Sequence, residues 1–245
     1  MRKLLLFFLL IFAVACSDKP KFTEKIIEKS PENCEEDCPS INLNYLICKR
    51  PNKFAENFNR EIESQVVNFL LSNQIDSLRN TDMTIDESLE AFIKDYDNLH
   101  QYFPNISAYE LILNDSISFQ NEKMLSVVSN RYSYVGGAHG IASKVFLNFD
   151  ISNGELIEKE DLFTDFSQVL KVAENHFKEE QNILVDSLNE KGFWFEDDKF
   201  HFPENVGIVG EHLILYYNPY EIAPYAEGIF ELRIPIEEVK KYLKY

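Results

Sequence analysis

The run YELILNDSISFQNEKMLSVVSNRYSYV at residues 109–135 decides the fold class of this chain. In its first part, apolar side chains recur at every second position, which is the period of a half-buried β-strand. These side chains are Tyr109, Leu111, Leu113, Ile117 and Phe119. The run from residue 125 to 135 keeps the same β character, and residues 145–151 repeat the alternation before the turn Ser152-Asn153-Gly154. We therefore expect consecutive strands across the middle of the chain.

Two helices are expected before these strands. Apolar residues recur at spacings of three and four, which marks one face of an amphipathic helix, in the segments 54–70 and 85–99. The second helix has a defined start, because Thr84 and Glu87 form a T-x-x-E capping box. A strand is expected just before the first helix, where Ile41, Leu43 and Tyr45 alternate.

The C-terminal part of the sequence repeats this mixture of elements. Residues 166–177 have helical spacing, residues 207–217 and 229–234 resemble strands, and Pro235 stands near the first turn of a short final helix. Helices and strands occur in blocks and do not alternate one by one. The order predicts an α+β fold, a two-part domain with a largely antiparallel sheet.

The N-terminus predicts a lipid anchor. Arg2 and Lys3 precede an apolar stretch at residues 4–14, which has the length of a signal peptide and is too short to span a bilayer. Val14-Ala15-Cys16 resembles a bacterial lipobox, in which the cysteine becomes the first mature residue and carries the lipid. We expect residues 1–15 to be a lipoprotein signal peptide and the mature protein to be held at the membrane through Cys16, on the extracytoplasmic side of the bacterial cell envelope. Whether this is the inner or the outer membrane is left open.

Residues 16–40 are expected to be a polar tether, because this segment has few apolar side chains. It contains Cys34 and Cys38, and Cys48 follows in the first expected strand. Three cysteines in an oxidising compartment favour one disulfide and one further thiol. We expect Cys48 to pair with Cys34 or Cys38, and with no histidine nearby we expect no metal site.

The charge of the chain restricts its partners. The full sequence has 24 basic and 41 acidic side chains, a formal net charge of −17. Without Arg2 and Lys3, 22 basic side chains would remain against the same 41 acidic ones, a net charge of −19. Such a chain repels nucleic acid and attracts cationic partners where its acidic groups gather on one face.

The motif YSYVGGAHG at residues 132–140 is the first candidate site. Gly136, Gly137 and Gly140 surround His139, and glycine clusters mark backbone with positive φ or a close approach to another segment. His139 can then be a general base or a ligand-binding group, and it is the one weak candidate for a catalytic residue. The alternative is a structural histidine in a demanding connection between strands.

The run YYNPYEIAPYAEG at residues 216–228 is the second candidate site. Two prolines, a glycine and four tyrosines predict an ordered irregular loop, and tyrosines pack well against sugars and protein surfaces. We expect binding residues in these two runs, with the acidic side chains favouring a basic partner. The set is Tyr134, His139, Tyr220, Glu221, Tyr225 and Glu227.

The order of YSYVGGAHG, VFLNFDISNGELIEKEDLF, YYNPYEIAPYAEG and ELRIPIEEV resembles the PdaC/RsiV-like superfamily. These are exported domains of unknown function, found in bacterial lipoproteins, beside a polysaccharide deacetylase domain and in an anti-sigma factor. The resemblance implies a PdaC-like α+β half at residues 41–140 and an RsiV-like α+β half at residues 141–245. The T-F-D-D-G and H-S-x-x-H runs of the deacetylase catalytic domain do not occur in this sequence.

The resemblance implies a binding role in place of catalysis. We expect a non-catalytic domain without cofactors that binds a basic, lysozyme-like extracytoplasmic protein or a cell-wall glycan such as a peptidoglycan fragment. The alternative is a cell-wall or polysaccharide hydrolase, or a deacetylase-type enzyme, that uses His139.

Overall fold

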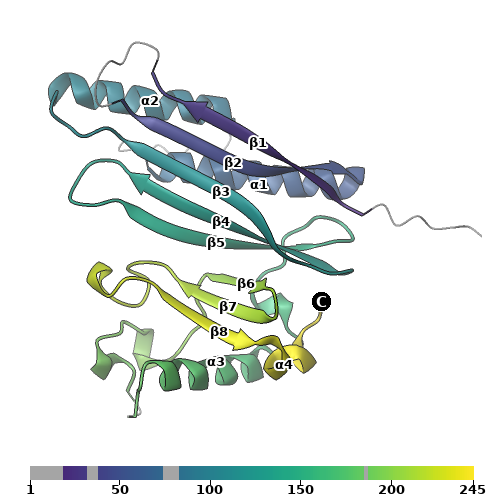
Figure 1. Ribbon diagram of the computed structural model, residues 1–245. Coiled ribbons are helices and arrows are strands. Elements are labelled where there is room, and N and C mark those ends of the chain that lie inside the picture. The colour runs from purple at the N-terminus through teal and green to yellow at the C-terminus, as the bar shows by residue number, and fades with distance from the viewer. Residues whose placement is uncertain (1–18, 32–37, 74–82, 185–186) are drawn as a thin grey trace, which may run out of the picture.

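The computed structural model describes residues 19–31, 38–73, 83–184 and 187–245 of the chain. The signal peptide, Cys16 and Cys34 lie outside these ranges. Two sheets and four α-helices form the described part, which confirms the α+β prediction (Figure 1). In this part of the chain, no helix is long and apolar enough to cross a membrane.

The first sheet has five strands in the order of the chain. They are β1 (Lys21–Lys29), β2 (Ser40–Arg50), β3 (Glu110–Gln120), β4 (Met124–Tyr134) and β5 (Ile141–Asp150). Neighbouring strands are antiparallel except for β2 and β3, which are parallel. A parallel pair needs a long crossover connection, and the two helices between β2 and β3 supply it.

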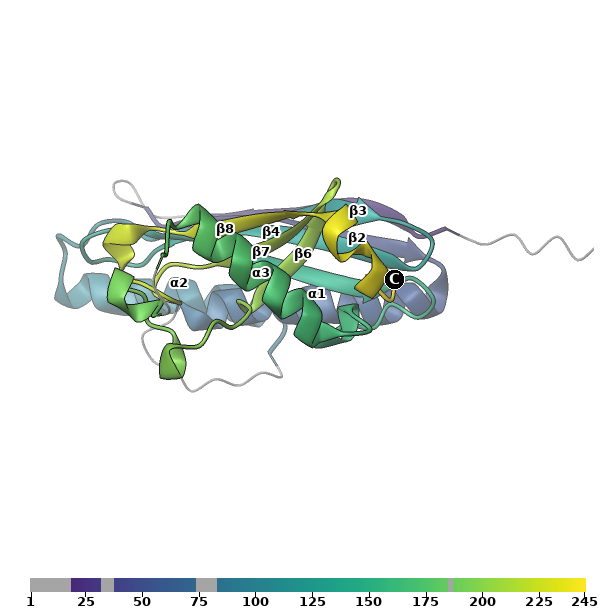
Figure 2. The ribbon, with the colours of Figure 1, turned by 90° about the horizontal axis from the view of Figure 1, so that it is seen from below.

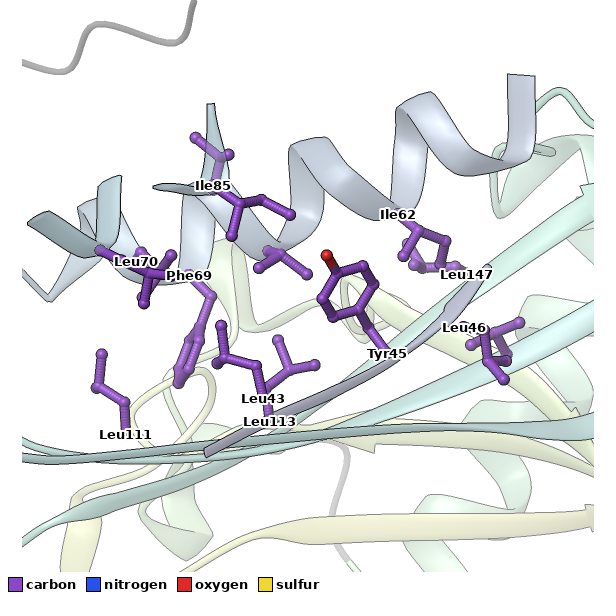
Figure 3. Packing of buried hydrophobic residues seen from close by; sticks show 14 of the residues in the cluster. Leu43, Tyr45, Leu46, Ile62, Phe69, Leu70, Ile85, Leu111, Leu113 and Leu147 are labelled. Carbon is purple, nitrogen blue, oxygen red and sulfur yellow. The ribbon is translucent and has the colours of Figure 1, made fainter. Parts of the chain in front are cut away.

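Helices α1 (Asn52–Ser72) and α2 (Ile85–Tyr102) cover one face of this sheet, as their apolar stripes predict. Figure 3 shows Leu43 and Tyr45 on the side of the sheet that faces the helix carrying Ile62, and all three side chains are buried. The capping box is confirmed, because the Thr84 hydroxyl accepts from the Glu87 backbone and the Glu87 carboxylate accepts from the Thr84 backbone.

The second sheet is antiparallel, in the order β6-β7-β8. Its elements are β6 (Asn205–Val209), β7 (His212–Tyr217), β8 (Phe230–Pro235), α3 (Phe166–Glu180) and α4 (Ile236–Val239). Short 3₁₀ turns stand at Glu160–Leu162, Asn189–Lys191, Glu196–Asp198, Tyr225–Glu227 and Lys240–Tyr242. The predicted strand at residues 207–217 is a hairpin, because Gly210 has a φ of 56° and turns the chain between β6 and β7.

The two sheets pack on each other through β4, β5, β6 and β7. Phe146 of β5 forms a small apolar cluster with Ile214 and Tyr216 of β7. A buried polar link lies beside it, where Asn148 donates to the Val206 carbonyl at 2.7 Å and accepts from the Ser126 hydroxyl at 2.8 Å. Figure 2 shows α3 lying on the side of the second sheet that faces away from the first. The layers therefore run from α1 and α2 through both sheets to α3.

The expected tether is wrong for residues 21–29, which form β1 at the edge of the first sheet. Every residue of β1 has a partner on β2, and Phe22 and Ile27 pack against the core. An edge strand is held mainly by its backbone ladder, so a mostly charged sequence is compatible with it. The first sheet also extends beyond residue 140, because β5 pairs with β4 along its full length.

The expected disulfide of Cys48 is also wrong. Cys48 is a buried free thiol, whose sulfur donates to the Arg50 carbonyl at 3.1 Å, whereas Cys38 is in a disulfide. Cys38 lies just before the extended strand β2, and Cys48 lies near the end of this strand. Because a strand rises about 3.3 Å per residue, the two cysteines are about 30 Å apart. A disulfide requires Cα atoms within about 7 Å of each other.

Candidate functional site

The connection between β4 and β5 presents His139 at the surface. Gly136 and Gly137 have φ values of 87° and 94°, which strain any residue other than glycine. Tyr134 at the end of β4 donates its hydroxyl to the Gly137 carbonyl at 3.2 Å and so braces the connection. His139 is exposed at the far end of this turn.

The loop between β7 and β8 is fixed at its start by Asn218 and Glu221. The Asn218 side chain accepts from the Lys144 backbone at 2.8 Å and donates to the Lys144 carbonyl at 2.9 Å, as a neighbouring strand would. The Glu221 carboxylate accepts from the backbone N–H groups of Asn218 at 2.8 Å and Glu204 at 2.9 Å. The loop is therefore docked on β5, beside the glycine-rich connection.

The structure brings the two sequence motifs together. The rings of His139 and Tyr225 are stacked, with centroids 3.7 Å apart and an interplanar angle of 13°. Tyr220 continues the group, with its ring 5.6 Å from that of Tyr225. The Tyr225 hydroxyl donates to the Gly140 carbonyl at 3.0 Å, which locks the loop onto the connection. We call these three rings, His139, Tyr220 and Tyr225, the aromatic surface.

The aromatic surface is open to solvent. His139 is exposed, the Tyr220 side chain is 51% exposed and Tyr225 is half-buried. Tyr220 has a φ of 70°, so an unusual backbone conformation presents its ring. Two stacked rings and a third beside them form a rigid platform, on which the apolar face of a sugar or a flat side chain can pack.

The other predicted binding residues have different surroundings. Glu221 and Tyr134 are engaged in holding the two loops, as their hydrogen bonds show. Glu227 is exposed in the 3₁₀ turn Tyr225–Glu227, next to the aromatic surface. The sequence analysis missed Lys144 and Asn218, although Asn218 lies within the quoted run, because their pairing depends on how the two sheets pack.

The geometry around His139 gives little support to catalysis. Its Nδ1 atom lies 3.2 Å from the Gly140 carbonyl oxygen, a backbone partner, and its ring is covered on one side by Tyr225. A general base needs an acid or a nucleophile within hydrogen-bond reach, and none of the described side chains is placed there for His139. Nor do the described residues include any group of three or more His, Cys, Asp or Glu side chains that could hold a metal ion.

Comparison with known families agrees with this two-part architecture. A family model described as "Deacetylase PdaC" matches residues 32–142, and one described as "Protein of unknown function (DUF3298)" matches residues 158–237. The chain therefore carries a PdaC-like domain followed by a DUF3298 region, which confirms the resemblance seen in the sequence. The aromatic surface takes His139 from the first region and both tyrosines from the second.

One curated relative is the peptidoglycan-N-acetylmuramic acid deacetylase PdaC of Bacillus subtilis strain 168. It is 26% identical over 156 residues, which are 62% of this chain and 32% of that protein. The chain thus spans about a third of the length of this relative.

Two solved structures share the fold. A member of the DUF3298 family from Bacteroides fragilis NCTC 9343 has a TM-score of 0.69 at 19% identity, over 92% of this chain and 94% of that chain. A DUF3298 family protein from Pseudomonas aeruginosa PAO1 has a TM-score of 0.62 at 19% identity, over 93% and 95%. At these identities the likeness concerns the fold alone.

Proposed function

We propose that this protein is a lipid-anchored, non-catalytic binding protein of the bacterial cell envelope, and that the aromatic surface binds peptidoglycan glycan strands. The observation that carries the proposal is the stacking of His139 on Tyr225. Two segments more than 80 residues apart in the chain are locked together there and present exposed rings. The curated relative is named for action on peptidoglycan, which favours this polymer among glycans.

A basic extracytoplasmic protein, such as a lysozyme, is the second candidate partner. It is favoured by the charge of the chain, −17 for the full sequence and −19 without Arg2 and Lys3. Opposite net charges accelerate association and make it sensitive to salt. Binding through aromatic stacking is much less sensitive to salt, so ionic strength separates the two candidates.

Co-sedimentation with purified peptidoglycan sacculi tests the glycan proposal, using the full chain in mild detergent. Because an aromatic contact contributes about 0.5–1.5 kcal/mol, His139→Ala and Tyr220→Ala should each weaken binding about two- to twelvefold. Tyr102→Ala is the matched control, since Tyr102 is an 80% exposed tyrosine on α2, in the helical layer. Equal binding by all three variants and the parent would refute the role of the aromatic surface.

The same variants test the protein partner by titration with lysozyme at low and high salt. Saturable binding that weakens at high salt, together with no retention on sacculi, would favour the basic protein over the glycan. No binding to either partner would refute both proposals and would favour the alternative, an enzyme that uses His139.

The anchor is tested separately with Cys16→Ala. We expect the parent protein to be recovered with membranes and to incorporate labelled fatty acid, because several acyl chains together hold a protein firmly at a bilayer. The variant should lose both properties. Membrane recovery of the unlabelled variant would contradict a lipid anchor at this residue.

A further inference from the structure

A cleft of about 370 Å³ lies between the two sheets, away from the aromatic surface residues. Its floor is the face of β3, β4 and β5 that points away from α1 and α2, and β7 and β8 form the opposite wall. The polar side chains that line it are Ser116, Ser118, Asn130, Lys144, Glu231 and Arg233. Its volume falls within the range of small-molecule sites, about 300–1,000 Å³.

The charged groups of the cleft are held in place by one carboxylate. Glu231 accepts from Lys144 Nζ at 3.0 Å with one oxygen and from Arg233 at 2.8 Å with the other. Burial opposes ionisation of Glu231, but these two cationic donors outweigh it and lower the pKa of its carboxyl group. Two cations and one anion leave the cleft with a net positive charge, in a chain whose net charge is −17.

Arg233 has donors to offer a ligand. A guanidinium has five N–H groups, and one of those of Arg233 donates to Glu231. Its side chain is 52% exposed, whereas those of Lys144 and Glu231 are 26% and 23% exposed. A planar guanidinium that is held on one edge and open on the other is suited to a carboxylate.

The floor of the cleft continues as a row of amide side chains. Asn114 of β3 is in register with Asn130 of β4, and Asn130 is in register with Lys144 of β5. Neighbouring strands are about 4.8 Å apart, so the row offers amide donors and acceptors at intervals comparable to the width of a sugar ring. Asn114 and Asn130 are both exposed. Phe146 and Ile214 add an apolar wall against which a ring can pack.

We propose that this cleft binds a sugar that carries a carboxylate, with Arg233 and Lys144 at the carboxylate and Asn130 and Asn114 at the hydroxyl or acetamido groups. The inference rests on the proposed function in one respect, that the partner is a glycan. The cleft then recognises the charged group of the glycan, and the aromatic surface stacks on its neutral rings.

Isothermal titration calorimetry of the full chain with four soluble probes tests this proposal. N-acetylmuramic acid and N-acetylglucosamine share a ring and differ by the lactyl carboxylate, glucuronic acid is a sugar acid of another source, and lactate has the carboxylate without a ring. We expect at least one sugar acid to bind about tenfold or more tightly than N-acetylglucosamine and lactate. Which of the two acids binds identifies the source of the natural ligand.

Three variants locate the binding. Arg233→Gln should weaken binding of the sugar acid about tenfold or more, and Asn130→Ala should weaken it several-fold while leaving the charge unchanged. Lys240→Gln is the matched control, because Lys240 is exposed and paired with Glu237 at 3.0 Å, much as Arg233 is paired with Glu231. An unchanged melting temperature of Arg233→Gln shows that the variant is folded.

The proposal is overturned if neither sugar acid binds, if N-acetylglucosamine or lactate binds as tightly, or if Arg233→Gln binds like Lys240→Gln. His139→Ala and Tyr220→Ala should leave titrations with the sugar acid unchanged. Failure of this proposal is therefore distinguishable from failure of the aromatic surface, which is measured on sacculi.

Discussion

Replacement of Gly207 by alanine should destabilise the contact between the two sheets. Gly207 lies on β6 directly over Phe146 of β5. A Cβ atom at this position would lie 2.6 Å from Cγ and 2.9 Å from Cε1 of that ring, and real Cβ contacts essentially never fall below 3.0 Å. Phe146 is 7% exposed and packs on Ile214 and Tyr216, so a shift of the ring away from Gly207 would disturb these contacts.

The expected cost follows from this overpacking. An added methyl group in a well-packed core costs about 1–3 kcal/mol of unfolding free energy, and we expect Gly207→Ala to fall within that range. Phe146→Ala alone should cost about 3–5 kcal/mol through lost apolar contact and the cavity that remains. Alanine lacks the ring atoms that the new Cβ would meet, Cδ1, Cγ and Cε1 of Phe146. The double variant should therefore be more stable than the sum of the two single costs, by about 1 kcal/mol.

Urea unfolding of the parent, both single variants and the double variant, followed by far-ultraviolet circular dichroism, measures these four free energies. The cycle separates a steric conflict from a general weakness of β6, because a general weakness would not be relieved by a smaller residue at position 146. A cost below about 0.5 kcal/mol for Gly207→Ala, or strict additivity in the double variant, would refute the close approach of the two sheets at this position.

Three further predictions concern the first layer of the fold. Thr84→Ala should cost about 1 kcal/mol in urea unfolding, because it removes the side-chain cap of α2; an unchanged midpoint would contradict the capping box. Burial raises the pKa of the Cys48 thiol, so alkylation of Cys48 should be slow in the folded protein and fast in urea. A disulfide-linked Cys48 peptide would contradict a free thiol. Burial lowers the pKa of Arg131 to about 10 and raises that of Asp115, with Arg131 still charged at neutral pH beside this carboxylate. Arg131→Met should therefore destabilise the protein more at neutral pH than at a pH near the raised pKa of Asp115, where that carboxylate is neutralised; a cost independent of pH would refute the attraction between the two groups.

The periodic elements could be predicted from the sequence because each buries one apolar face. Helices α1, α2 and α3 and strands β3 and β4 lie where their spacing places them. Strand β1 could not be predicted in this way. Its sequence, KFTEKIIEK, is largely exposed, and the strand is stabilised mainly by backbone hydrogen bonds to β2. The periodicity of the side chains does not report these backbone hydrogen bonds.

The candidate site could be predicted in part. The glycines around His139 and the tyrosines of the second loop indicated both halves of the aromatic surface. Backbone with positive φ favours glycine and a surface of aromatic rings requires aromatic residues, so both features can be recognised from the residue types. The contact between the two halves could not be predicted from the residue types, because it depends on how the two sheets pack. Lys144 and Arg233 are 89 positions apart, and only the packing of β5 and β8 across the two sheets turns them toward one cleft.

Both sites depend on the junction of the two family regions. The aromatic surface joins His139, within the PdaC-like match, to Tyr225, within the DUF3298 match, and the cleft likewise joins Asn130 to Arg233. Neither region alone has the complete set of side chains for either site. The interface that holds them together is formed by Phe146 and its neighbours and by the buried Asn148 link, in which polar groups are paired across the layers. Because an unpaired buried polar group is costly, this link specifies one arrangement of the two sheets. The binding geometry is therefore a property of the interface, and a substitution such as Gly207→Ala, which replaces no residue of either site, should weaken ligand binding as well as stability.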